Sequence, residues 1–146
     1  MSRENIEIVR RFLEEFDAAL EAFWAEPDPG DASAALRDAP FFEMMHPGAE
    51  WISLFYPESF RGKDEMLRGV SEWLDAADQW RVRTNQLLDA GDRVLGVVRV
   101  SIRGKGSGVP VEQTLYAVVT VRDGMVAAIH EFGERAEALE AAGLSE

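Results

Sequence analysis

The residues with the clearest potential for chemistry lie near the C-terminal end, where the sequence reads VAAIHEFG from Val126 to Gly133. His130 and Glu131 are neighbours at the end of this apolar run. In an extended strand, neighbouring side chains point to opposite faces, so at most one of the two can face the interior. A carboxylate in an apolar pocket is poorly solvated, which raises its pKa and suits it to proton exchange near neutral pH. Which residue faces inward therefore decides whether the protein has a candidate catalytic acid or base.

Arg99 is the second candidate, because a strand there would place Arg99, Ser101 and Arg103 on one face. An inward Arg99 beside Glu131 would form a buried ion pair that holds two strands together and lowers the pKa of the carboxyl. Its planar guanidinium could alternatively bind a carboxylate or phosphate of a substrate. A catalytic and a structural interpretation of Glu131 are therefore both open.

The composition limits the class of protein in which these residues act. The 146 residues, 47% hydrophobic and 29% charged, fit one globular domain over 1–146 with a core that has room for a pocket. No apolar run approaches the roughly 20 residues of a membrane span, and the N-terminal sequence MSRENIEIVRR is too polar for a signal peptide. We therefore expect a cytoplasmic protein without membrane contact.

Cysteine, histidine and charge exclude several kinds of site. There are no cysteines, so disulfides, thiolate metal sites and a cysteine nucleophile are excluded. With two histidines, a histidine-rich metal centre is not expected, and His46 before Pro47 is interpreted as a cap at a helix end. The net charge of -12 would repel phosphates, so no nucleic-acid partner is expected.

Helical patterns dominate the first half of the chain. Apolar residues recur every three or four positions along three segments, which predicts helices over Arg3–Trp24, Ala32–Met45 and Lys63–Asp78. The run EPDPGD, residues 26 to 31, must break the first of them because it contains two prolines and a glycine. Alternation around Ala49 and Trp51 indicates a first strand, and FYPESFRG, residues 55 to 62, looks irregular.

Strand patterns dominate the second half, and four strands are expected over Trp80–Asp89, Arg93–Arg103, Pro110–Arg122 and Met125–Phe132. The segments between them, AGD, GKGSG and DG, are typical of hairpin turns. AEALEAA, residues 136 to 142, predicts a short helix stopped by Gly143. Helices followed by strands predict an α+β domain with helices packed on one face of a curved antiparallel sheet.

Several motifs follow one another in a recognisable order: ENIEIVRRFLEEF near the start, HisPro-x-x-GluTrp at 46 to 51, FRGKDEMLRGVSEWL at 60 to 74, DAGDRV at 89 to 94, GKGSG at 104 to 108, VRDG at 121 to 124 and ERAEALEAAGL at 134 to 144. Together they resemble the SnoaL-like proteins of the nuclear transport factor 2-like superfamily, which includes ketosteroid isomerase and limonene epoxide hydrolase. The resemblance implies a cone: a strongly bent antiparallel or mixed sheet wrapped around three N-terminal helices. It also implies a deep apolar pocket and a homodimer formed through the sheet, but no single reaction.

The resemblance implies a direction for Glu131. In SnoaL-like polyketide cyclases the last long strand carries an acid/base Asp, and counting from Gly124 this Asp falls on Glu131, facing inward, while His130 faces outward. The cyclases' His on the neighbouring strand would fall at Ala117, which cannot transfer protons. The Asp-Arg-Asp set of limonene epoxide hydrolase is also missing, because the strand around Arg99 offers no carboxylate.

The resemblance also suggests orienting and wall residues. Ketosteroid isomerase uses a Tyr and a protonated Asp as donors; alternation from Ala117 turns Tyr116 away from the pocket and leaves Tyr56 as a candidate. In a cone fold the core and the pocket wall are partly the same residues, which gives as substrate-binding candidates Phe16, Trp51, Phe55, Trp73, Leu115 and Ala117.

Three functions remain open. The first is a cofactor-independent acid/base enzyme of isomerase, cyclase or hydrolase type acting on a compact, largely apolar metabolite, with Glu131 as proton carrier and Arg99 or Tyr56 as orienting group. The second is a non-catalytic module that holds an apolar ligand in the same pocket. The third is a dimerisation domain whose cavity is filled by Phe and Trp.

Overall fold

The computed structural model of the protein describes residues 2–25, 32–104, 106 and 108–145. Its helices are α1 (Ser2–Ala25), α2 (Ala32–Arg37), α3 (Pro40–Glu43), α4 (Lys63–Ala76) and α5 (Arg135–Ala142). Its strands are β1 (Met45–Ile52), β2 (Ser59–Arg61), β3 (Ala77–Ala90), β4 (Arg93–Gly104), β5 (Pro110–Arg122) and β6 (Met125–Phe132). The predicted helix break at 26 to 31 lies outside the described residues, as do residues 105 and 107 of the GKGSG turn.

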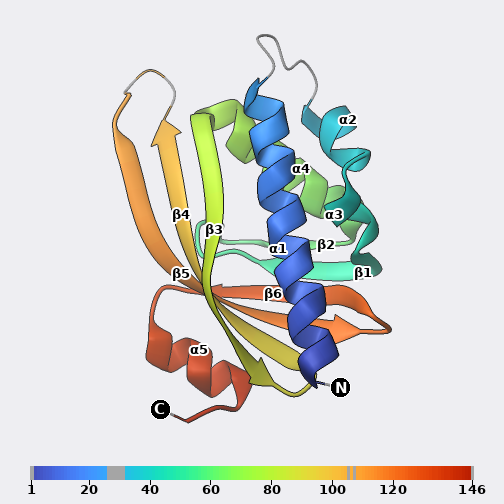
Figure 1. Ribbon diagram of the computed structural model, residues 1–146. Helices are drawn as coiled ribbons and strands as arrows, with labels where there is room; N and C mark the ends of the chain where they lie inside the picture. Colours follow the sequence, from blue (N-terminus) through green and yellow to red (C-terminus); the bar gives the residue numbers. More distant parts are fainter. Residues whose placement is uncertain (1, 26–31, 105, 107, 146) are drawn as a thin grey trace.

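The strands form one six-stranded sheet in the order β2-β1-β6-β5-β4-β3. Neighbouring strands are antiparallel, except that β6 runs parallel to β1. Figure 1 shows that the long strands bend strongly and that α1 to α4 lie on one side of the sheet. The expected α+β fold with a curved sheet around N-terminal helices is thus confirmed.

Apolar side chains form two clusters, one on each face of the sheet. The larger lies between α1 to α4 and the face that we call the inner face, which carries Val82, Val98 and Leu115. The smaller lies on the opposite, outer face, where Leu95, Val97 and Val118 pack against α5 residues Ala138, Leu139 and Ala142. The helices therefore cover both faces instead of the expected one, because β4 and β5 carry apolar residues on both sides.

The expected helix over Ala32–Met45 is wrong, since two short helices, α2 and α3, take its place. Pro40 accounts for the break. Its ring disfavours the helical region for the preceding residue, and Ala39 is extended with φ -77° and ψ 146°. Pro40 then begins α3 at a position where its missing N–H leaves no hydrogen bond unmade.

Two strands, β1 and β3, begin earlier than the sequence predicts. β1 already starts at Met45, so His46 lies in a strand and not at a helix end; its Nδ1 accepts the Gly48 N–H at 3.1 Å. The interpretation of His46 as a helix cap is therefore wrong. In the stretch expected to be irregular, β2 pairs with β1 through Phe60 and Trp51, and β3 begins at Ala77, directly after α4.

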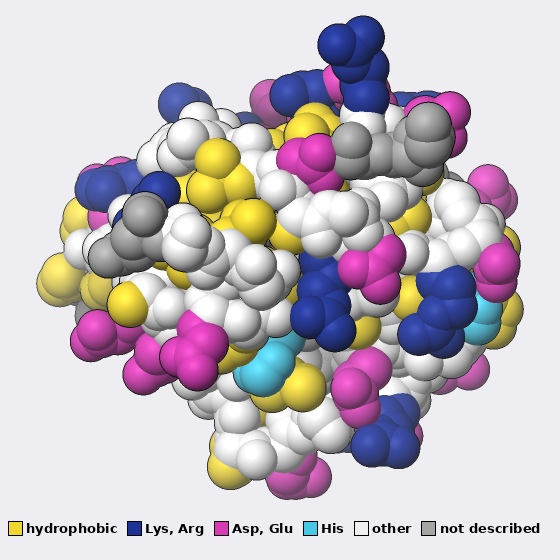
Figure 2. Space-filling model, turned by 90° about the horizontal axis from the view of Figure 1, so that it is seen from below, with side chains coloured by type: hydrophobic (Ala, Val, Ile, Leu, Met, Phe, Trp, Pro, Cys, Tyr) yellow, Lys and Arg dark blue, Asp and Glu magenta, His cyan; other side chains and the backbone are white. Residues whose placement is uncertain are grey.

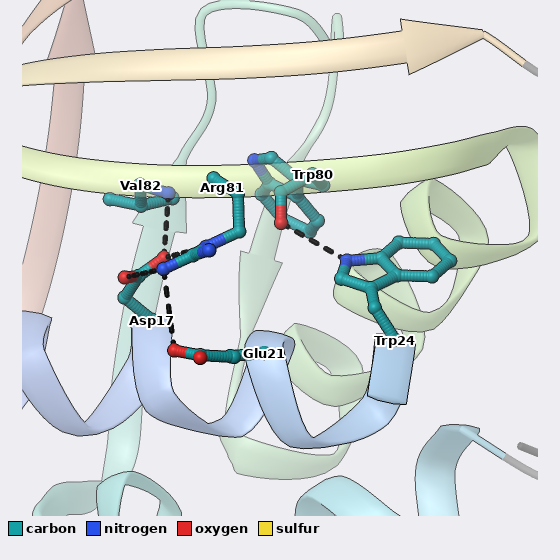
Figure 3. A network of polar contacts seen from close by, with 6 residues as sticks. All are labelled: Asp17, Glu21, Trp24, Trp80, Arg81 and Val82. Carbon is teal, nitrogen blue, oxygen red and sulfur yellow. Dashed lines mark hydrogen bonds and ion pairs between the residues drawn. The ribbon is translucent and has the colours of Figure 1, made fainter. Parts of the chain in front are cut away.

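The strand β3 forms an edge of the sheet, and α1 covers that edge (Figure 3). The Asp17 carboxylate accepts the Val82 N–H at 2.9 Å, and the Trp24 Nε1–H donates to the Trp80 carbonyl oxygen at 3.1 Å. Arg81 adds a forked ion pair to Asp17, with N–O distances of 3.0 and 2.8 Å. An edge strand exposes unpaired backbone groups, and α1 satisfies two of them.

The surface carries charges of both signs. On the face seen from below, acidic and basic side chains are interspersed among apolar ones (Figure 2). None of the helices in the described part of the chain is long and apolar enough to cross a lipid bilayer.

Candidate functional site

A cavity of about 100 Å³ lies between α1, α3 and α4 on one side and the inner face of the sheet on the other. Glu131 is the one charged residue among the described residues that line it; the others are aliphatic or aromatic. A molecule in this cavity would therefore meet hydrocarbon and aromatic rings on nearly every side, and a single carboxyl group. The predicted inward direction of Glu131 is confirmed.

Three donors hold the Glu131 carboxyl. The indole Nε1–H of Trp51 donates to Oε2 at 3.0 Å, and the backbone N–H of Leu54 donates to Oε1 at 2.9 Å. The hydroxyl of the buried Ser53 donates to the same carboxyl, while its oxygen accepts the Phe55 N–H at 3.1 Å. The carboxyl is thus fixed in orientation by groups from the end of β1 and the loop after it.

Burial raises the pKa of Glu131 above the usual range of a glutamate, and the hydrogen bonds from Leu54, Trp51 and Ser53 offset this only in part. None of the ion pairs among the described residues involves Glu131. A cation beside the carboxyl would lower its pKa. Without one, the group exchanges protons closer to neutral pH, which a general acid or base requires.

The parallel pairing of β1 with β6 brings Trp51 to Glu131. Trp51 is in register with Ile129, and the Trp51 ring stacks on Phe60 with centroids 5.1 Å apart. Helix α4 passes close to both rings at Gly69, where a Cβ would lie 2.9 Å from Phe60 and 3.0 Å from Trp51. Glycine at position 69 therefore allows the helix to pack on the ring that holds the carboxyl.

The prediction that Arg99 points inward is wrong. Its neighbours Val98 and Val100 line the cavity, so alternation turns Arg99 to the outer face. There its side chain is 45% exposed and forms an ion pair with Glu112 at 3.0 Å. Arg99 can neither pair with Glu131 nor orient a ligand in the cavity, and the buried ion-pair interpretation of Glu131 is ruled out with it.

Tyr56 packs beside the site without lining the cavity. Its ring makes edge contacts with Phe60 at 5.1 Å and Trp73 at 6.0 Å. Burial raises the pKa of Tyr56, and so does the Glu72 carboxylate, to which its hydroxyl is hydrogen-bonded. The Tyr56 hydroxyl is thus bonded to Glu72 of α4 and does not point to Glu131.

His130 lies on the outer face, as expected. It is in register with Val118, which packs beneath α5, and its ring centroid is 4.2 Å from that of Phe132. Burial lowers the pKa of His130, and the charge of Glu50 offsets this only in part. It is separated from the cavity by the sheet itself.

All six residues expected in the wall line the cavity, while their role in binding stays a prediction: Phe16, Trp51, Phe55, Trp73, Leu115 and Ala117. Sequence reasoning misses Ser53 and the Leu54 N–H as partners of Glu131, because their position depends on the β1–β6 pairing, which no local pattern encodes. Trp80, a buried residue of the core, also lines the cavity and is not among the expected wall residues.

Solved structures with this fold are distant in sequence. A proposed SnoaL-like polyketide cyclase of Jannaschia sp. CCS1 is 18% identical with a TM-score of 0.66, covering 99% of this chain and 95% of that one. A ketosteroid isomerase-like protein of Catenulispora acidiphila DSM 44928, solved with trimethylamine, is 13% identical with a TM-score of 0.65 and coverages of 92% and 93%. An epoxide hydrolase of M. tuberculosis similar to limonene epoxide hydrolase is 14% identical, with a TM-score of 0.63 and coverages of 97% and 90%. At these identities the likeness shows the fold alone.

No curated protein sequence matches the chain. The family model of the SnoaL-like domain, however, matches residues 9–129. This range contains the Trp51 and Trp80 side chains and most of the cavity wall, whereas Glu131 lies just beyond its end. Since the match covers most of the chain and the fold agrees with it, the chain belongs to the SnoaL-like domain family.

Proposed function

We propose that the protein is a cofactor-independent acid/base enzyme in which Glu131 transfers a proton to and from a compact, largely apolar metabolite held in the cavity. The observation that supports this most is the isolation of the Glu131 carboxyl. It is the one charged group on the described cavity wall, it is held by three donors, and no cation of the described residues pairs with it. A buried carboxyl without a cationic partner contributes little to the stability of the fold. Its position in the cavity wall allows it to exchange protons with a bound molecule.

The geometry supports a two-stage proton transfer. Leu54 and Trp51 donate to different Glu131 oxygens and Ser53 donates to the same carboxyl, so three of its roughly four acceptor sites are filled and one remains for a bound molecule. The carboxylate can take a proton from a carbon acid or from a water molecule, and the resulting carboxyl can return it to another position.

Proteins with this fold support a small-molecule site. The M. tuberculosis structure is of an epoxide hydrolase, and the C. acidiphila protein was solved with trimethylamine. The space of about 100 Å³ also argues against the third possibility, a dimerisation domain with a filled cavity. The homodimer through the sheet stays a prediction.

A non-catalytic ligand-binding role is the alternative, and one observation favours it. Ala117 stands opposite Glu131 in the register of β5 and β6, where a second proton-transfer group would be expected from the cyclases.

The two roles separate in an assay of a cell-extract metabolite pool in D₂O, followed by mass spectrometry. We expect the wild-type protein to consume a metabolite or introduce deuterium into it, and Glu131→Gln to spare that metabolite. Glu112→Gln is the matched control, because Glu112 is an exposed glutamate on the outer face. If metabolites are retained on all three proteins and none is altered, the protein is a binding module and the acid/base proposal fails.

A further inference from the structure

Trp80 carries a buried donor without an acceptor. The residue is 7% exposed and lines the same cavity as Glu131. Its Nε1–H has no hydrogen-bond partner among the described residues. Folded proteins satisfy nearly all buried donors, so an unpaired one in a cavity wall calls for an explanation.

The Trp80 ring is held in place from several sides. Phe16 packs edge-on against it at 5.5 Å, and Trp73 lies at 5.8 Å. The backbone of Trp80 is fixed through its carbonyl oxygen, which accepts the Trp24 Nε1–H; Figure 3 shows this bond, and none to the Trp80 indole nitrogen. These contacts fix the orientation of the indole ring and keep its Nε1–H from turning toward another partner.

The two polar groups of the wall lie at different levels of the cavity. Glu131 is in register with Ala117, which pairs with Gly96 of β4. Trp80 is in register with Ile102, further along β4. A ligand that touches both groups therefore extends along the strands.

We propose that the Trp80 Nε1–H binds a neutral hydrogen-bond acceptor, a carbonyl or ether oxygen, on an apolar ligand whose other end lies at Glu131. The acceptor is neutral because the described wall offers no cation to balance a negative group, and a charge buried without a partner is strongly disfavoured. This inference rests on the proposed function only in placing the ligand in that cavity; it does not require proton transfer.

The competing explanation is that the N–H faces an aromatic ring, a weak interaction that would leave Trp80 a plain core residue. Two probes of nearly the same shape separate the explanations. α-Tetralone carries one carbonyl oxygen, and tetralin lacks it. Heteronuclear NMR of isotope-labelled protein resolves the indole N–H signals of the four tryptophans, and Trp80→Phe identifies that of Trp80.

We expect α-tetralone, and not tetralin, to move the Trp80 N–H proton signal downfield. We also expect α-tetralone to bind roughly five- to tenfold more tightly, the effect of about one hydrogen bond. Trp80→Phe should remove this preference, whereas Tyr116→Phe, which removes a polar group packed on the outer-face cluster, should keep it. No shift with α-tetralone, equal shifts with both probes, or a preference that survives Trp80→Phe overturns the proposal.

Glu131→Gln distinguishes this proposal from the proposed function. The Trp80 shift should persist in this variant, because the donor and its acceptor do not involve the carboxyl. A Trp80 shift in a protein that alters no metabolite would leave the donor role intact and refute the enzyme. Altered metabolites without any Trp80 shift would support the enzyme and refute the donor role of Trp80.

Discussion

Two glutamates on neighbouring strands show how strongly position decides the chemistry of one residue type. Glu131 faces the apolar cavity, and burial raises its pKa. Glu112 is exposed on the outer face, where hydrogen bonds from Arg99 and Ser101, together with the charge of Arg99, lower its pKa. The two side chains carry the same functional group, yet only the first has the environment of a proton carrier.

This contrast predicts opposite pH dependences of stability. A raised folded-state pKa means that folding favours the protonated Glu131, so its contribution is present at low pH and is lost as the pH rises through that pKa. The free energy of unfolding of the wild type, relative to Glu131→Gln, should therefore fall as the pH rises from the usual glutamate range. Urea unfolding at a series of pH values measures it.

Glu112→Gln supplies the control with the reverse sign. Because the folded-state pKa of Glu112 is lowered, its contribution is present above the usual glutamate range and is lost as the pH falls. A difference between wild type and Glu131→Gln that stays constant with pH would show that burial does not perturb the carboxyl.

At the scale of elements, local pattern predicts the second half of the chain better than the first. β5 and β6 have the bounds expected from alternation and hairpin turns. The helix over Ala32–Met45 fails because the apolar period continues through Pro40, where backbone sterics overrule it. β2 is a short strand that pairs with β1 across the loop between them. No pattern within β2 itself therefore predicts the pairing.

The contact of α1 with β3 is an element-scale feature with a testable stability. Asp17 accepts hydrogen bonds from Arg81 and from the Val82 N–H. Burial alone would raise the pKa of Asp17, but these bonds and the charges of Arg81 and Arg83 bring it below the usual range. Asp17→Asn should lower the free energy of unfolding at neutral pH by about 1–3 kcal/mol.

The stabilisation from Asp17 should be lost as the pH falls below the usual aspartate range, so wild type and Asp17→Asn should converge in acid. Glu21→Gln serves as control: Glu21 lies 3.5 Å from Arg81 and its side chain is 68% exposed, so little change is expected. If both substitutions change the free energy of unfolding equally, Asp17 does not stabilise the edge of β3.

At the scale of the whole molecule, the sheet separates the cavity from the cluster beneath α5. The inner face carries the cavity, and the outer face carries the α5 cluster. The family resemblance predicts the inward Glu131, and it predicts the six wall residues because the core and the pocket wall partly coincide in a cone fold. It does not predict the direction of Arg99 or the donors of Glu131, which depend on how strands distant in sequence meet.

This separation predicts two variants with opposite effects. Ala117→Leu should weaken α-tetralone binding at least about tenfold by filling the cavity, while stability is kept or raised by about 0.5–2 kcal/mol. Leu139→Ala should lower the free energy of unfolding by about 2–5 kcal/mol through lost packing under α5, with α-tetralone affinity unchanged. Calorimetric titration and urea unfolding measure both; parallel losses in both variants would contradict the separation.

The place of β6 in the sheet has a consequence for synthesis on the ribosome. This strand follows the other five in sequence order within the described residues, yet it is inserted between β1 and β5, in the interior of the sheet. The donors that hold Glu131 precede it by 80 residues for Trp51 and 77 for Leu54. A nascent chain therefore carries both donors, and an open edge on β1, long before the carboxyl arrives. A product stalled before residue 131 would lack the carboxyl in the cavity wall, so this site can form only once β6 has entered the sheet.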